Sequence, residues 1–225
     1  MLQLLFSAVL ALSPTQGQDT PPDAKAIEAA VAELKTAFEK GKPPDRVIAI
    51  EKAARVVDGS VIAWVAKGLK VSEATVQDAA VEALRFMKHP DALEALHDCA
   101  KRDKKLQKEP EAYSKLIKAI GQHGSTRSIE ILAEGGITSY DYNVVEARIL
   151  SLANIRSEKS VEQLIGTMRT AGREKVAPHM AAFRMALMRL TGADEGLSQD
   201  AWSSWWNEHK KDFVVNATPP PTTKT

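Results

Sequence analysis

The chain has 225 residues, of which 44% are hydrophobic and only 5% aromatic, and its formal net charge is +1. A net charge so close to zero gives no overall electrostatic reason to expect binding to nucleic acid or to an anionic membrane. The chain has one cysteine, which excludes an internal disulfide, and its hydrophobic fraction is enough for one elongated domain with a real core.

Residues 1–17 predict a signal peptide. They carry no charged side chain, and their apolar run from Leu4 to Leu12 is shorter than the roughly 20 residues that span a bilayer. Thr15 and Gly17 are small residues at the −3 and −1 positions of a cleavage site before Gln18. The alternative is a short buried first helix. We expect an exported protein, periplasmic or secreted, without a stable membrane anchor after cleavage, and residues 18–23 as a polar leader.

Five helices are predicted between residues 24 and 102. The first covers about 24–40, and GKPP at 41–44 breaks it. Asp58 is placed to cap the third helix, Ser72 to start the fourth, and Pro90 to occupy the first turn of the fifth. The apolar stripes of the first four are Ile27, Val31, Leu34 and Phe38, then Val47, Ile50, Ala54 and Val57, then Ile62, Val65 and Leu69, then Val76, Ala80, Ala83 and Met87.

The fifth helix ends in the densest basic cluster of the sequence, which comprises Lys101, Arg102, Lys104, Lys105 and Lys108. Cations at the C-terminus of a helix are favoured by its macrodipole, so a solvated helix end is the preferred interpretation. A docking patch for an acidic partner is the alternative. Cys99 follows Leu93 and Leu96 at helical spacing, which predicts a buried thiol rather than a reactive one.

Two further helices are predicted at about 112–122 and 126–134, followed by a longer loop with Tyr140 and Tyr142. Exposed tyrosines make good rigid contacts, so these two are candidates for partner binding. Covering the end of the core is their alternative role.

Residues 144–170 form a helix, a turn and a second helix, with Ser157 at the N-cap position of the second. The pattern recurs, because the apolar residues Leu152, Val161 and Leu164 align with Leu84, Leu93 and Leu96, and with Ile120, Ile129 and Leu132. Such units bury their apolar faces by stacking on one another. A generic bundle rich in alanine and leucine is the alternative.

The segment 200–213 places Trp202, Trp205 and Trp206 on one side of a last helix, after an inner helix at about 180–190. Three large aromatic side chains suit a helix that caps the open end of a stack. A ligand-binding aromatic patch is the alternative. Residues 214–225 are rich in proline and threonine and predict a disordered tail.

The helices VQDAAVEAL and VVEARILSL, each followed by a turn and a leucine-spaced helix, resemble HEAT-like repeats. The ending LTGADEGLSQDAWSSWWNEHKKDF also resembles the closing segment of HEAT-repeat proteins exported by planctomycete-like bacteria. The resemblance implies an all-α protein over 24–213, a right-handed α-solenoid of about five helical pairs with a Trp-rich capping helix at its C-terminus. Where family repeats often carry Arg, this chain has Gln77 and Val145, so the usual ladder of charges between repeats is not predicted.

The same resemblance implies a non-catalytic scaffold or adaptor that binds an unidentified protein or peptide, with no cofactor, in the concave groove formed by the inner helices. Polar residues on those helices and tyrosines of the loop are the candidate contacts, namely Arg55, Gln77, Glu82, Lys115, Lys118, Tyr140, Tyr142, Arg148, Arg184 and Arg189. They form a modestly basic set, which favours an acidic or extended peptide.

The alternative function is an enzyme, or an enzyme subunit, with a metal or cofactor near His89–Cys99. No two histidines have the spacing of a zinc-binding HExxH helix, and the sequence has neither a phosphate-binding glycine loop nor a GxSxG nucleophile elbow. We therefore expect no catalytic or metal-binding residues.

Overall fold

The computed structural model describes residues 22–134, 136–137 and 141–215. These residues form α-helices and short 3₁₀ segments, and no strand occurs among them. The predicted signal peptide, most of the leader, Tyr140 and the tail from residue 216 lie outside the described residues. Within the described part no helix is both long and apolar enough to cross a membrane.

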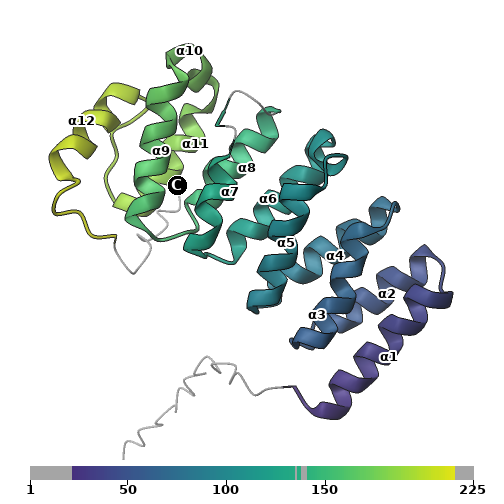
Figure 1. Ribbon diagram of the computed structural model, residues 1–225. Coiled ribbons are helices and arrows are strands. Elements are labelled where there is room, and N and C mark those ends of the chain that lie inside the picture. Colours follow the sequence, from purple (N-terminus) through teal and green to yellow (C-terminus); the bar gives the residue numbers. More distant parts are fainter. Residues whose placement is uncertain (1–21, 135, 138–140, 216–225) are drawn as a thin grey trace, which may run out of the picture.

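The helices stack as successive pairs along one axis (Figure 1). Their bounds are α1 Ala24–Lys40, α2 Pro43–Ala53, α3 Gly59–Val65, α4 Ala74–Phe86, α5 Pro90–Arg102, α6 Pro110–Gln122, α7 Ile129–Ala133, α8 Tyr142–Leu152, α9 Glu158–Ala171, α10 Arg173–Val176, α11 Met180–Thr191 and α12 Gln199–His209. The 3₁₀ segments are η1 Ala66–Lys70, η2 Leu106–Lys108, η3 Thr126–Ser128 and η4 Ala177–His179.

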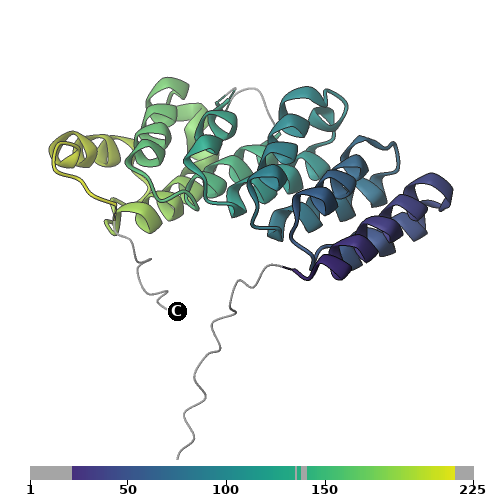
Figure 2. The same ribbon diagram turned by 60° about the horizontal axis from the view of Figure 1, so that its bottom comes forward.

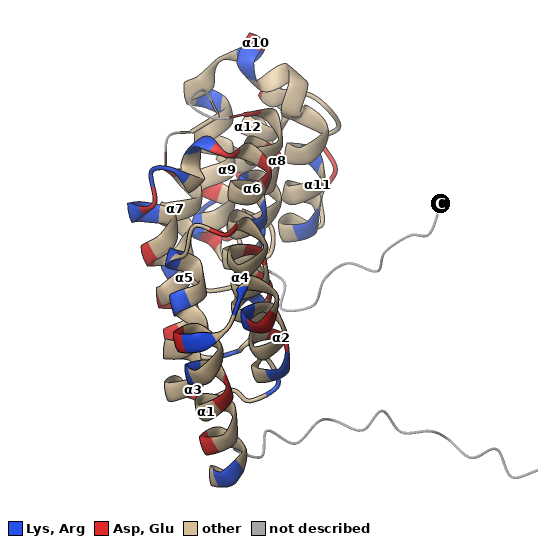
Figure 3. Ribbon diagram, turned by 90° about the vertical axis from the view of Figure 1, so that its right-hand side faces the viewer, with Lys and Arg blue, Asp and Glu red and all other residues tan. Residues whose placement is uncertain are grey.

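Two layers run the length of the molecule. In the first layer α1, α3, α5, α7, α9 and α12 each pack against the next, and in the second layer α2, α4, α6, α8 and α11 do the same. Figure 2 shows the stack turned, with the helices of each pair side by side, and Figure 3 shows it from the side, with α1 at the bottom and α10 at the top. The predicted stack of about five helical pairs is therefore confirmed, whereas its handedness stays a prediction.

The predicted helix starts follow local capping chemistry at most positions. Asp58 accepts a hydrogen bond from the Ser60 amide at 2.8 Å, and Ser157 accepts one from the Lys159 amide at 3.2 Å. Ser72 does not start α4, because Glu73 occupies the N-cap position and makes no side-chain cap. Sequence reasoning also missed α10 and η4, which interrupt the simple alternation between α9 and α11.

The closest approach between second-layer helices is at Gly121 of α6. A Cβ atom there would lie 2.8 Å from the Cα of Ser151 in α8, and nearer still to the Ser151 side chain. The Ser151 hydroxyl donates to the carbonyl of Ile117 at 3.1 Å, so the two backbones are also joined by a hydrogen bond. A glycine is required here because no other residue leaves room for the neighbouring helix.

The closing helix α12 packs against α9 and ends the first layer. Trp202 is fully buried, and its indole Nε1 donates to the carbonyl of Gly196 at 3.0 Å. Trp206 is also buried, whereas Trp205 is half-buried and stacks on His209 with ring centroids 4.6 Å apart. Phe213 meets both Trp205 and Trp206 edge-on. This aromatic cluster covers the end of the core, as the capping interpretation predicts.

Candidate functional site

The outward face of the second layer is the surface on which most of the predicted contact residues were placed. Its central row holds one side chain from each helix, two residues before a buried aliphatic residue: Ile48, Glu82, Lys118, Leu150 and Met185. One turn further along the helices lies a second row: Lys52, Phe86, Gln122, Asn154 and Arg189. We call these two rows the second-layer face.

Three apolar side chains on this face are exposed to solvent. Phe86 is 57% exposed and Met185 is 60% exposed, and Ile48 is exposed to a similar extent. Sequence reasoning missed all three. The alignment of the repeats contains a signal for two of them, because Ile48 and Met185 are apolar at the position where other repeats have Glu82 and Lys118. Such residues at equivalent positions of a repeat stack are typical contact points for a partner chain.

Two of the predicted cations near this face are paired with carboxylates of the protein itself. Lys115 lies 2.7 Å from Asp78 of α4 and 3.4 Å from Glu111, and these carboxylates raise the pKa of its ammonium group. Arg184 donates its Nε to Asp194 at 2.7 Å, which lowers the pKa of that carboxyl to about 2. The positive charges of Lys115 and Arg184 are therefore balanced within the protein.

The remaining charged residues predicted here are exposed. Glu82 pairs with Arg85 at 3.3 Å, whereas Arg55, Lys118 and Arg189 form no ion pair with any described residue.

Arg148 does not belong to this surface. It is 3% exposed, and its guanidinium donates to the carbonyls of Ile131 and Leu132 at 2.6 and 3.0 Å and to the hydroxyl of Tyr113 at 2.9 Å. It therefore joins α8 to α6 and α7 inside the core. The prediction failed because the helical period placed Arg148 on the correct helix but could not show that α7 covers it.

Gln77 and Tyr142 are partly committed to the fold. Gln77 is half-buried and its side chain donates to the carbonyl of Leu69 at 3.3 Å. Tyr142 is 48% exposed, donates to Glu146 at 2.8 Å and stacks on His179 with centroids 4.6 Å apart. One ring face of Tyr142 thus covers His179, while the rest of the side chain stays accessible.

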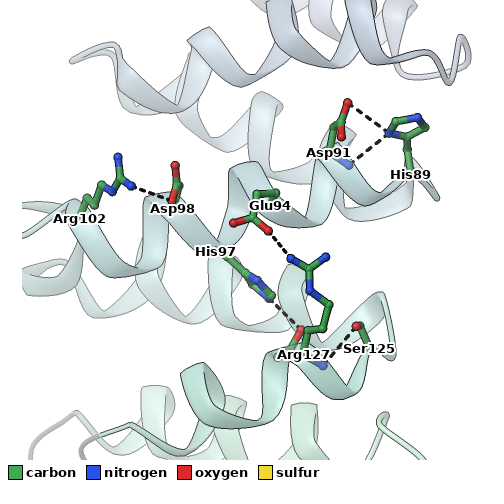
Figure 4. A network of polar contacts seen from close by, with 9 residues as sticks. His89, Asp91, Glu94, His97, Asp98, Arg102, Ser125 and Arg127 are labelled. Atoms are coloured by element: carbon green, nitrogen blue, oxygen red, sulfur yellow. Dashed lines mark hydrogen bonds and ion pairs between the residues drawn. The ribbon is translucent and has the colours of Figure 1, made fainter.

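The alternative site near His89–Cys99 lies on α5 (Figure 4). His97 Nε2 lies 2.9 Å from the hydroxyl of Ser128, which is the distance of a nucleophile–base pair. Ser128 is fully buried, however, and burial lowers the pKa of His97 to about 4. The pair therefore has no substrate access at its oxygen and serves to join α5 to η3.

The same region contains Cys99 and His89, which are the remaining candidates for a catalytic or metal-binding role. Burial raises the pKa of the Cys99 thiol to about 11, so the reactive thiolate is scarce at neutral pH. His89 is turned to the helix start, where its Nδ1 accepts a hydrogen bond from the Asp91 amide at 3.2 Å (Figure 4). Within the described residues no three side chains of His, Cys, Asp or Glu come together as a metal site.

Ion pairs connect successive repeats along the first layer. Arg127 reaches Glu94 at 2.7 Å, Lys159 reaches Glu130 at 3.2 Å, and Arg173 pairs with Asp200 of α12. A ladder of charges between repeats is thus present, contrary to what Gln77 and Val145 indicated, because residues at other positions form it. Each exposed pair contributes at most about 1 kcal/mol, so the ladder aligns the repeats more than it stabilises them.

Comparison with known families agrees with this architecture. The PBS lyase HEAT-like repeat family model matches residues 76–102, which cover most of α4 and all of α5. No curated protein matches the chain. The matched pair packs on its neighbours as the other pairs do, so the chain has the all-α fold of HEAT-like helical repeats.

Proposed function

We propose that the protein is a non-catalytic interaction scaffold that binds a segment of another protein on its second-layer face. The observation that carries the proposal is the exposure of Ile48, Phe86 and Met185 at equivalent or adjacent positions of the stacked repeats. Solvent-exposed aromatic and aliphatic side chains of this size favour burial in a complex, by about 25 cal/mol per Å² of apolar surface removed from water. HEAT-like helical folds are commonly interaction scaffolds, which supports the same function.

The partner proposed for this face is an extended peptide or an exposed protein segment. An apolar side chain of such a segment is expected at Phe86 and another at Met185. Lys52 of this face pairs with Glu33, whereas Lys118 and Arg189 form no ion pair with any described residue, so acidic side chains of the segment fit beside those two cations.

Export of the protein by residues 1–17 is a separate proposal, which rests on the sequence of that segment and on the resemblance of the closing segment to exported bacterial proteins.

Site-specific photocrosslinking tests the binding face. A photoreactive phenylalanine analogue is placed at Phe86 or at Met185, and the control position is Thr170, an exposed residue of α9 in the first layer. In the cells that produce the protein, both face positions should crosslink to the same partner, and the control should not. Crosslinking at the control alone, or different partners at the two face positions, would contradict the proposal.

The localisation is tested apart from the binding. Fractionation of the same cells, with mass spectrometry of the N-terminus of the recovered protein, shows whether the chain is exported and starts at Gln18. A cytoplasmic protein that retains residues 1–17 would disprove export and leave the binding face untouched.

A further inference from the structure

A second surface, separate from the second-layer face, lies beside the loop between α5 and α6. A pocket of about 580 Å³ opens between η1 and the C-terminal part of α5, and the loop that follows α5 closes one side. We call it the cationic trough. Its rim carries the side chains of Lys70, Arg102, Lys104 and Lys105.

The two carboxylates of the trough each have partners within the protein. Asp98 pairs with Arg102 at 3.4 Å, and Asp103 Oδ1 accepts hydrogen bonds from the backbone amides of Lys105 and Leu106 at 3.0 and 2.9 Å. Lys70 and Lys105 are exposed and form no ion pair with any described residue. Asp103 keeps its negative charge, and the carbonyl end of α5 adds roughly half of another. The four cations of the rim still outnumber the two carboxylates of the pocket, so its lining is net positive.

The floor of the trough is apolar. Leu69 is buried beneath it, and Ala66, Ala95 and Cys99 are half-buried along it. A small inorganic anion would use the rim and leave this floor exposed to water. Nucleic acid is disfavoured for a different reason, because no aromatic side chain lines the pocket to stack on a base. A chain that carries both carboxylates and apolar side chains matches the rim and the floor together.

The trough also continues beyond the first pocket. A neighbouring groove of about 730 Å³ shares Lys70, Asp103 and Lys105 with it and extends over Val71 and Leu106 towards the start of α6. This second groove is also lined by Asp78, Glu109 and Glu111, and its Lys115 pairs with two of them. Carboxylates of an extended segment therefore fit the first pocket and the junction lysines, and the segment continues over Val71 and Leu106 with uncharged side chains.

We propose that the cationic trough binds an extended acidic segment of a partner protein. Carboxylates of the segment pair with Lys70 and Lys105, and an apolar side chain between them rests on Ala95 and Cys99. This is the docking interpretation of the basic cluster, now assigned to defined residues and joined to Lys70, which is distant from the cluster in sequence.

Cys99 provides a direct measurement, because it is the single cysteine of the chain and lies on the floor of the trough. The rate of its reaction with N-ethylmaleimide is measured at mildly alkaline pH, with and without a synthetic peptide of glutamates that carries a leucine at every third position. At a peptide concentration about ten times its Kd, about one tenth of the protein is free, so the reaction should slow about tenfold.

Charge reversal then locates the effect. The double variant Lys70→Glu/Lys105→Glu should lose the protection, and the control Lys118→Glu/Arg189→Glu on the second-layer face should keep it. Each variant is compared with its own rate without peptide, because Lys70 also influences the pKa of Cys99. Circular dichroism shows whether the variants fold, and the milder Lys105→Gln should weaken protection even if the double variant does not fold.

Two further peptides separate the terms of the proposal. Serine in place of leucine should abolish most of the protection if the floor takes part, and lysine in place of glutamate should abolish all of it. Three results would overturn the proposal. They are protection by the serine peptide or the lysine peptide as strong as that by the leucine peptide, undiminished protection in the Lys70→Glu/Lys105→Glu variant, and no protection by the leucine peptide. Since Phe86 and Met185 take no part in this assay, its failure leaves the second-layer face untested and is distinguishable from failure of the scaffold function.

Discussion

Replacing Trp202 by alanine should destabilise the C-terminal repeat more than any other change in α12. The side chain is fully buried where α12 packs against α9, so its removal leaves a cavity there. Truncation of a buried aromatic side chain costs roughly 3–5 kcal/mol. The hydrogen bond from Nε1 to Gly196 is lost as well, which adds about 1 kcal/mol. This loss compares with a total stability of roughly 5–15 kcal/mol for a typical domain.

The matched control is Trp205→Ala. Trp205 belongs to the same helix and is the same residue type, but it is half-buried and contacts His209 and Phe213 near the surface. Its truncation should cost about half as much, because only part of its surface is removed from water. Urea unfolding followed by circular dichroism gives both free energies of unfolding.

Hydrogen exchange gives the location. In a repeat stack each unit depends mainly on its neighbours, so the Trp202 variant should lose amide protection first in α12 and α9 and last in α1 to α4. Trp202→Ala with a wild-type urea midpoint, together with red-shifted tryptophan emission in the unaltered protein, would refute the capping interpretation and favour a ligand patch.

Three further changes test other contacts of the core. Arg148→Met should cost several kcal/mol in urea unfolding, because it removes the buried hydrogen bonds of the guanidinium to the carbonyls of Ile131 and Leu132 and to the Tyr113 hydroxyl. Arg148→Lys should recover little, because one ammonium group cannot replace the planar fork. Gly121→Ala should lower the thermal midpoint, although alanine is favoured over glycine in a helix by about 1 kcal/mol, since its Cβ would collide with Ser151; a raised midpoint would contradict the close approach. The pKa of His97 is lowered to about 4 by burial, so the unfolded chain binds more protons below about pH 6.5, and stability should fall as the pH drops from there towards 4. Urea midpoints at pH 7 and pH 5 should differ less in His97→Gln than in the wild type; an equal difference would show that His97 does not contribute.

The helix pairs could be predicted from sequence because their signals are local. Pro90 at a first turn, Asp58 and Ser157 at N-caps, and apolar residues at helical spacing each act within a few residues of the chain, and the structure has the corresponding helices. Ser72 failed as a start because the true N-cap residue, Glu73, carries no side-chain cap from which to recognise it.

The site could not be predicted to the same extent, because exposure and pairing depend on neighbours in other repeats. The spacing along the helix predicts an exposed side chain for Arg148 as it does for Lys118. In the structure α7 covers Arg148, whereas Lys118 is exposed. Lys115 looked available for a ligand, but its partner Asp78 lies on the preceding second-layer helix. Sequence spacing within one helix carries no information about either relation.

The same dependence explains where free positive charge gathers on this molecule. On the regular helices, a cation of one repeat lies within reach of a carboxylate of an adjacent repeat, as Lys159 of α9 does with Glu130 of α7, so many of these charges are paired inside the stack. Figure 3 shows blue and red segments interspersed along the layers in keeping with this pairing. In the loop between α5 and α6, Asp103 accepts hydrogen bonds from the backbone amides of Lys105 and Leu106, and Lys105 forms no ion pair with a described residue. Cations there outnumber carboxylates around the trough, so a cationic surface arises in a protein whose net charge is only +1.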